Sequence, residues 1–185
     1  AGEEPFGSIE EMARKYVQAI QSVQKNGPYH LVGYSFGGAV AQEIAYMLES
    51  KGQTVSMLGL IDAIIPIAEI INSVKNTGMN ENGPISKQGN QSSALSSRII
   101  AETQRVKKRL EQHTFKPCHA NTILWLTNDQ DNENNKTLLA NAWGTYCKNI
   151  EVLDIDASHD ELLNHKNSFE ITKVINDRYV DRDET

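Results

Sequence analysis

Cysteine and basic residues are scarce in this chain, and long apolar runs are absent. Two cysteines in 185 residues are too few for a disulfide framework or a metal cluster. Lysine and arginine number 18 against 24 acidic residues, and the resulting net charge of −6 argues against a nucleic-acid partner. No apolar run is long enough to cross a bilayer, and the first residues do not resemble a secretory leader. We therefore expect a soluble cytoplasmic protein with reduced thiols, no metal and no membrane contact.

The length of 185 residues suits one domain with a substantial core, so we expect a single domain over residues 1–185. The first residue is alanine rather than methionine, which suggests a piece of a longer chain. Neither feature indicates an oligomeric state.

The most informative stretch runs from residue 29 to residue 49. It begins with a short β-type run over 29–32 and ends with a helical pattern of apolar and small residues. Between them stands Gly33-Tyr34-Ser35-Phe36-Gly37, a G-x-S-x-G pentapeptide. Placed between a strand and a helix, this pattern predicts a nucleophile elbow, which is a sharp turn that holds a serine hydroxyl above the end of a sheet.

The glycines of the pentapeptide follow from that geometry. A tight turn strains the backbone of Ser35, and it brings strand and helix so close that we expect side chains at positions 33 and 37 to collide. The turn also sets Ser35 at a helix N-terminus, where free backbone N–H groups favour negative charge. The backbone N–H of Phe36 is therefore the predicted oxyanion-hole donor.

The remaining pattern predicts an α/β fold with a mostly parallel sheet and helices on both faces. An apolar run at 54–61 is typical of a strand buried on both faces, and Asp62 follows it. Strand, helix and strand in this order form a βαβ unit, so Ser35 and Asp62 should emerge at the same edge of the sheet. Further strands are expected at 121–126 and 150–155. A capping box at Ser8 predicts the first helix, and Asn167 or Ser168 should cap the last one.

Residues 63–115 differ in character from the rest of the chain. An apolar stretch gives way to a loop rich in Asn, Gly and Ser, and a helix follows. An insertion directly after a catalytic strand is the usual position of an active-site lid. The apolar residues at its start, Ile64, Ile65 and Ile67 among them, either line a substrate channel or serve only as packing.

Three residues offer the groups that acyl transfer needs at neutral pH, namely a nucleophile, a base and a carboxylate that orients the base. They are Ser35, Asp62 and His159, which occur in the chain order of α/β-hydrolases. His159 follows the strand at 150–155, so it should reach the same edge of the sheet as the other two.

The identity of the acid has alternatives. In many α/β-hydrolases the acid follows the next strand along the chain, which here points to Asp129 or Asp131. Their Asn-rich surroundings also suit a solvated loop. Asp160 adjoins His159 but is poorly placed to reach the ring of its own neighbour. We favour Asp62, because the apolar strand before it holds it at the sheet edge.

Several of these segments together resemble one family. They are the run from Ser8 to Ala13, the run from Gly27 to Gly38, Leu60-Ile61-Asp62, and Ser158-His159. They resemble the thioesterase domains of polyketide, non-ribosomal peptide and fatty acid synthases, which belong to the α/β-hydrolase superfamily. The resemblance implies that Ser35 takes an acyl or peptidyl chain from the phosphopantetheine arm of a carrier protein. His159 then activates water or an internal nucleophile, and no bound cofactor is required.

The resemblance also implies two further features. Members of the family carry strands before the helix that starts near Ser8, and the loop after one of them supplies a second oxyanion N–H. Residues 1–7 cannot supply it, so we expect this chain to be the C-terminal part of a larger synthase.

The basic residues of the helix near 95–110 either form a solvated face or receive an acidic carrier protein; they are Arg98, Arg105, Lys107, Lys108 and Arg109.

Two other functions remain open from the sequence. One is a free-standing esterase or editing thioesterase that acts on small esters or stalled acyl groups. The other is a catalytically silent module that uses a hydrolase scaffold to hold an acyl ligand or a partner. The acyl chain, the pathway, and the choice between hydrolysis and cyclisation depend on the shape of the lid, which composition does not reveal.

Overall fold

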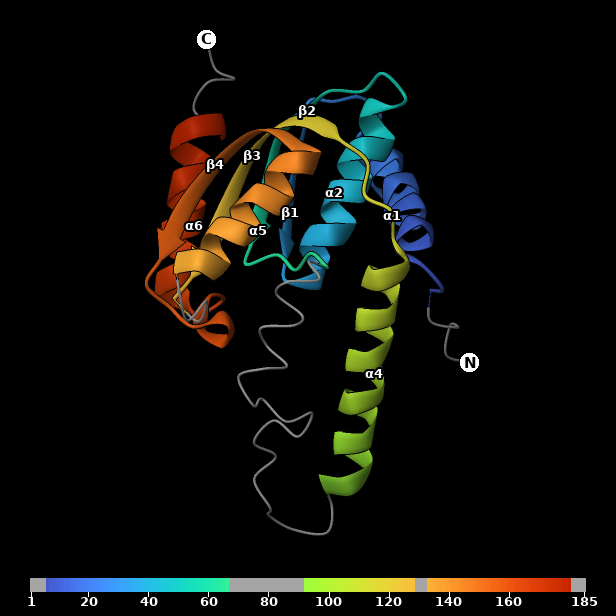
Figure 1. The fold of residues 1–185 in the computed structure, drawn as a ribbon. Helices are drawn as coiled ribbons and strands as arrows, with labels where there is room; N and C mark the ends of the chain where they lie inside the picture. The colour runs from blue at the N-terminus through green and yellow to red at the C-terminus, as the bar shows by residue number, and fades with distance from the viewer. Residues whose placement is uncertain (1–5, 67–91, 129–132, 181–185) are drawn as a thin grey trace.

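A parallel four-stranded sheet forms the centre of the described part of the molecule (Figure 1). The computed structural model describes residues 6–66, 92–128 and 133–180. The strands are β1 (Tyr29–Tyr34), β2 (Val55–Ile61), β3 (Cys118–Thr127) and β4 (Cys147–Ile155), and they lie side by side in that order. Every neighbouring pair is parallel, as predicted.

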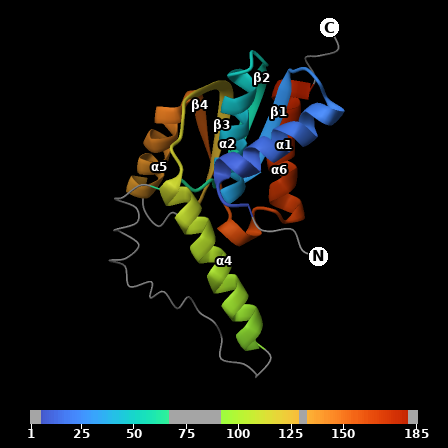
Figure 2. The same ribbon diagram turned by 90° about the vertical axis from the view of Figure 1, so that its right-hand side faces the viewer.

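Helices cover both faces of the sheet, which confirms the predicted α/β layering (Figures 1 and 2). Helices α1 (Ile9–Val23), α2 (Phe36–Glu49) and α5 (Glu133–Tyr146) contribute to the core on one face. Helix α6 (His165–Ile175) and the π-helical turn η2 (Asn176–Val180) contribute to the smaller core on the other face. The short 3-10 turn η1 (His159–Glu161) precedes α6.

The first helix starts where the sequence predicted. The Ser8 side chain accepts a hydrogen bond from the Glu11 backbone N–H at 3.1 Å, and the Glu11 carboxylate accepts one from the N–H of Gly7 at 2.8 Å. Two otherwise unsatisfied N–H groups are thus paired at the helix start. Ile9, Ala13 and Val17 then form the buried stripe at helical spacing.

The predicted cap of the last helix is wrong. Asn164, not Asn167 or Ser168, caps α6, and its side chain accepts a hydrogen bond from the Asn167 N–H at 3.0 Å. Asn167 is instead buried, and its amide donates to the carbonyl of Glu161 at 3.0 Å. It therefore ties the helix to the turn that carries His159.

Helix α4 (Ser92–Gln112) extends away from the sheet in both views (Figures 1 and 2). It belongs to the segment predicted as a lid, whose residues 67–91 lie outside the described part. Among the side chains of α4 that the structure describes, Leu110 is buried and Val106 packs against the core. No helix in the described ranges is long and apolar enough to span a bilayer.

Candidate active site

Ser35 is the single residue between β1 and α2. Its backbone has φ of 53° and ψ of −124°, a conformation that side chains rarely adopt. Its N–H donates to the carbonyl of Ile61 at 2.9 Å, and its own carbonyl accepts from the N–H of Gly38 at 3.0 Å. The predicted strained turn between strand and helix is therefore confirmed.

The crowding at this turn involves Gly33 and Gly38 rather than Gly33 and Gly37. A Cβ atom on Gly33 would lie 2.3 Å from the carbonyl oxygen of Gly37, and a Cβ on Gly38 would lie 2.3 Å from the Cβ of Ala63. A Cβ on Gly37 would meet nothing within 4 Å, so the expected collision at position 37 is wrong. Gly37 instead lines an apolar groove of about 300 Å³ between α1 and α2.

Asp62 leaves the end of β2 in an equally unusual conformation, with φ of 43°. Its backbone N–H donates to the carbonyl of Trp125 at 2.8 Å, and its Oδ1 lies 3.4 Å from the backbone N–H of Thr127. Its side chain is nearly inaccessible to solvent. The indole N–H of Trp143 in α5 donates to the carbonyl of Ala63 at 3.2 Å, which fixes the next peptide.

His159 begins the turn η1, shortly after the end of β4. Its Nδ1 lies 2.5 Å from Oδ2 of Asp62. The carboxylate of Glu161 accepts hydrogen bonds from both the N–H and the hydroxyl of Ser158, which closes the turn. The structure thus brings Asp62 and His159 into contact across 97 residues of sequence.

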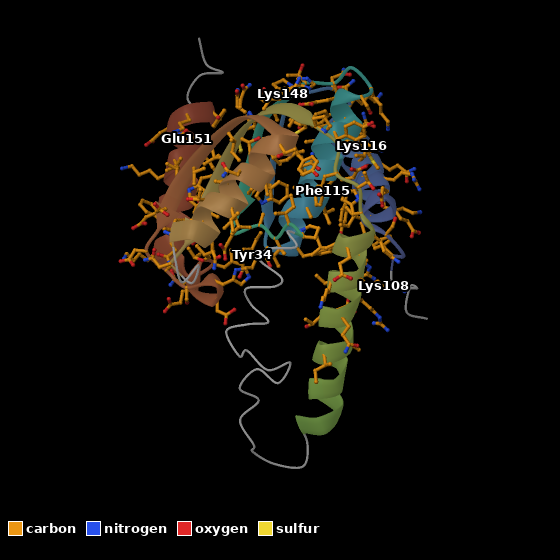
Figure 3. The ribbon with its side chains drawn as sticks, viewed as in Figure 1. Tyr34, Lys108, Phe115, Lys116, Lys148 and Glu151 are labelled. Carbon is orange, nitrogen blue, oxygen red and sulfur yellow. The ribbon has the colours of Figure 1, made fainter. Side chains whose placement is uncertain are left out.

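Tyr34 also contacts His159, which sequence reasoning missed. The two rings stack with centroids 4.7 Å apart and planes inclined by 25°. The Tyr34 hydroxyl donates to the His159 carbonyl at 2.8 Å. Figure 3 shows Tyr34 at the edge of the sheet from which α4 extends. Strand alternation could have indicated the face on which Tyr34 lies, because it sends residues 33 and 34 to opposite faces of the sheet.

The other predicted site residues are placed as follows. Phe36 is the first residue of α2, where backbone N–H groups have no partner within the helix. Ile64 is 41% exposed, whereas Ile65 is 6% exposed and belongs to the main core. Ile67 lies outside the described residues, as do the alternative acids Asp129 and Asp131. Asp160 is exposed.

A buried polar cluster joins α1, α2 and the segment after α4. Nδ1 of His113 lies 2.8 Å from a carboxylate oxygen of Glu10, and Nε2 lies 3.5 Å from one of Glu43. The side chains of Glu43 and His113 are almost fully inaccessible to solvent. Burial raises the pKa of Glu43 to about 7, with a smaller opposing effect from Lys116.

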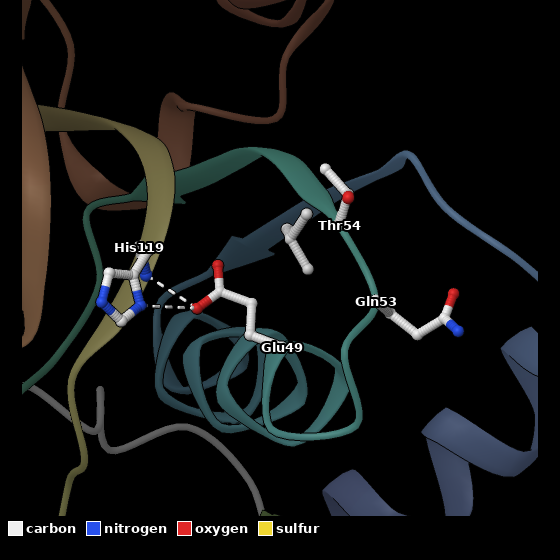
Figure 4. Close-up of a pocket in the computed structure, with 5 residues that line it drawn as sticks. Glu49, Gln53, Thr54 and His119 are labelled. Carbon is white, nitrogen blue, oxygen red and sulfur yellow. Dashed lines mark hydrogen bonds and ion pairs between the residues drawn. The ribbon is translucent and has the colours of Figure 1, made fainter.

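A polar hollow of about 310 Å³ lies at the amino-terminal edge of the sheet (Figure 4). Glu49 at the end of α2 accepts a hydrogen bond from the His119 backbone N–H at 2.7 Å, and the His119 ring lies against Lys148. Parallel strands place Asp62 and His159 at the opposite, carboxyl-terminal edge, where α/β folds carry their sites.

The two cysteines, Cys118 and Cys147, lie side by side on β3 and β4 as buried free thiols, with sulfur atoms 4.0 Å apart. Within the described residues, no group of three or more His, Cys, Asp or Glu side chains could hold a metal ion.

Comparison with known proteins places nearly all of the chain in one family. A family model described as "Thioesterase domain" matches residues 1–179. Malpinin synthetase of Mortierella alpina is 26% identical over 181 residues, which is 92% of this chain and 2% of that protein. Atromentin synthetase of Tapinella panuoides is 44% identical over 73 residues, which is 40% of this chain and 8% of that protein. The chain therefore spans only a small part of the length of these relatives.

Solved structures with similar folds include other thioesterase domains. The NocB thioesterase domain from the nocardicin cluster has a TM-score of 0.68 at 22% identity, over 95% of this chain and 75% of that one. The four-domain nonribosomal peptide synthetase AB3403 has a TM-score of 0.72 at 20% identity, over 97% of this chain and 16% of that one. At this level of identity the likeness establishes the fold, which is the α/β-hydrolase fold of these domains.

Proposed function

The chain belongs to the thioesterase domain family, and we propose that it releases an acyl or peptidyl chain from the phosphopantetheine thioester of a carrier protein. The family makes it a hydrolase acting on thioesters. The proposal that a serine nucleophile performs this release rests on one observation. It is the 2.5 Å contact between Asp62 Oδ2 and His159 Nδ1, beside the strained turn at Ser35. A carboxylate that accepts from Nδ1–H fixes the tautomer in which Nε2 of the imidazole carries the lone pair and can act as the base.

In the proposed reaction, Ser35 Oγ attacks the thioester carbonyl carbon while His159 Nε2 takes the hydroxyl proton. The backbone N–H of Phe36 stabilises the oxyanion that forms. The C–S bond then breaks, and the thiol leaves with the proton from His159. Water, or a nucleophile within the acyl chain, repeats the sequence on the acyl-serine, which gives an acid or a ring and restores Ser35.

A carrier-protein partner is supported by the relatives, which are synthetases of much greater length. Two of the basic residues of α4 are already engaged. Arg105 and Arg109 pair with Glu102, and Arg109 also donates to the carbonyl of Phe6. The exposed Lys107 and Lys108 are the remaining described candidates for contact with an acidic carrier.

The first test is labelling of the intact protein with a fluorophosphonate, followed by mass spectrometry. We expect one adduct, located at Ser35, that is absent in Ser35→Ala and present in Ser22→Ala, which alters an exposed serine of α1. Acyl chains loaded on a carrier protein should then be released faster than the same acyl groups presented as simple esters. Folded protein without an adduct would favour the silent binding module. Equal rates on both substrates would favour a free-standing esterase.

A further inference from the structure

We propose that Tyr34 is a positioning residue that holds the imidazole of His159 in the orientation needed to accept the proton of Ser35. This proposal rests on the proposed function, because it assigns His159 the role of base. It concerns the residue directly before the nucleophile, whose side chain is variable in the G-x-S-x-G pattern.

The hydrogen bond to Asp62 does not by itself fix the imidazole. It holds Nδ1 at 2.5 Å from the carboxylate oxygen, yet small coupled changes of the His159 torsions χ1 and χ2 can still tilt the ring at this single contact. Such a tilt would move Nε2, the atom that must face the nucleophile. The His159 side chain is 33% exposed, so close packing does not surround the whole ring.

The Tyr34 ring supplies a second restraint. It lies against the face of the imidazole with the centroids 4.7 Å apart and the planes 25° from parallel. A tilt at the Nδ1 contact would drive one edge of the imidazole into the phenol ring. A stacked aromatic pair is also favourable in itself, beyond the area it buries.

The Tyr34 hydroxyl holds the backbone of the same histidine. It donates to the His159 carbonyl at 2.8 Å, at the start of the turn η1. Burial, together with the nearby carboxylates of Asp160 and Asp62, raises the pKa of Tyr34 above its usual value. The hydroxyl therefore keeps its proton at neutral pH and remains a donor.

The position of Tyr34 in the chain ties the base to the nucleophile. One peptide bond separates Tyr34 from Ser35, so the residue that orients the imidazole moves with the turn that carries the hydroxyl. Alternation along β1 directs Gly33 toward α2 on one face and Tyr34 toward the core shared with α6 on the other. Residue 34 is thus the position of the pentapeptide that faces the turn with His159.

The test compares Tyr34→Phe, which keeps the ring, with Tyr34→Leu, which removes it. We expect Tyr34→Leu to lower kcat by about tenfold to a hundredfold with KM within about twofold, since misplaced catalytic groups cost rates of this order. Tyr34→Phe should retain most of the activity. The matched control is Tyr29→Phe, which removes a comparable hydroxyl-to-carbonyl bond (3.0 Å, to Gln24) at the other end of β1.

A second measurement does not depend on activity. In the NMR spectrum, the Cε1–H of His159 should be shifted by the ring current of Tyr34. The shift should persist in Tyr34→Phe and vanish in Tyr34→Leu. If Tyr34→Leu does not fold, Tyr34→Met replaces it, and the wild-type spectrum alone still reports the stacking.

Three outcomes would overturn the proposal. They are wild-type kcat in Tyr34→Leu, equal losses in the Phe and Leu variants, and the absence of a ring-current shift in the wild type. Failure of the proposed function would give a different set of results. The wild type would then lack both the Ser35 adduct and thioester turnover, while the NMR comparison would still decide whether Tyr34 orients the ring.

Discussion

Ser35 and Asp62 have positive φ angles of 53° and 43°, and they are the two non-glycine residues of the described chain with this property. Such conformations cost roughly 1–3 kcal/mol each, and they persist only where the surroundings impose them. Here the adjacent strand imposes both, because Ser35 N–H bonds to Ile61 and Asp62 N–H bonds to Trp125. The backbone strain is concentrated at the nucleophile and at the acid.

Replacement of Asp62 by asparagine tests the role of the acid. An amide can donate to Nδ1, which would favour the tautomer whose Nε2 carries the proton. We expect kcat to fall by about 10³- to 10⁴-fold, as in serine proteases altered at the equivalent group. Asp160→Asn is the matched control, because it changes an exposed carboxyl next to His159 and should leave kcat within about twofold. A small loss in Asp62→Asn would direct attention to Asp129 and Asp131.

The sequence was sufficient to predict Ser35, Asp62 and His159 as the site residues. A local motif marks Ser35, and the order of the strands places Asp62 and His159 after strands that end at the same edge of the sheet. The contact between Asp62 and His159 agrees with that choice, although their catalytic roles remain predictions. The stacking of Tyr34 was missed, since it joins residues 125 positions apart and no pattern records which rings meet. The sequence pattern favours small residues such as Gly38 where the helix meets the sheet, but it does not identify Ala63 as the neighbour that crowds Gly38.

Helix α2 approaches the sheet edge closely at Gly38. Gly38→Ala would place its Cβ 2.3 Å from that of Ala63, next to Asp62, whereas Gly37→Ala enters open space. We expect Gly38→Ala to destabilise the fold by about 1–3 kcal/mol. Gly37→Ala should be neutral or should stabilise it by up to about 1 kcal/mol, because alanine suits a helix better than glycine. Urea denaturation would measure both, and equal effects would contradict the observed packing.

Strand β2 was predicted closely, because a buried parallel strand has a continuous apolar sequence. Strands β3 and β4 each begin three residues before the predicted starts, at Cys118 and Cys147, because their first residues are partly polar and carry no continuous apolar pattern. Helix starts were predicted less well. Ser8 caps α1 as predicted, but α6 starts at His165 with Asn164 as its cap, while Asn167, one of the predicted caps, is buried and bonded to the carbonyl of Glu161. The contact of the Asn167 amide with the Glu161 carbonyl decides which asparagine is buried, and a local sequence pattern does not indicate this tertiary contact.

At the scale of the whole molecule, the buried Glu43 makes stability depend on pH. Its pKa is about 7 in the fold against 4.5 as the ordinary value, because burial raises it more than Lys116 lowers it, and the nearby Glu10 adds a smaller rise. The folded chain thus keeps a proton that the unfolded chain loses. The stabilisation from this proton is complete below pH 4.5, and it is lost as the pH rises to about 7.

Glu43→Gln should remove this dependence. We expect the wild type to lose about 3 kcal/mol of unfolding free energy relative to the variant as the pH rises through this window. Denaturation curves at several pH values would measure the difference. Glu111→Gln, which alters an exposed carboxyl of α4, controls for the loss of one charge. A difference between wild type and Glu43→Gln that does not change with pH would contradict the prediction.

Among the described side chains of α4, those that attach it to the rest of the protein lie near its C-terminal end, and this has a mechanical consequence. The buried Leu110, the bond from Arg109 to Phe6 and the contacts of His113 all lie within or just beyond its last turns. A helix of 21 residues is about 30 Å long. Since displacement grows with distance from the pivot, a rotation of about 10° at this end would carry the opposite end through about 5 Å. Small changes in packing around His113 would therefore be amplified along α4.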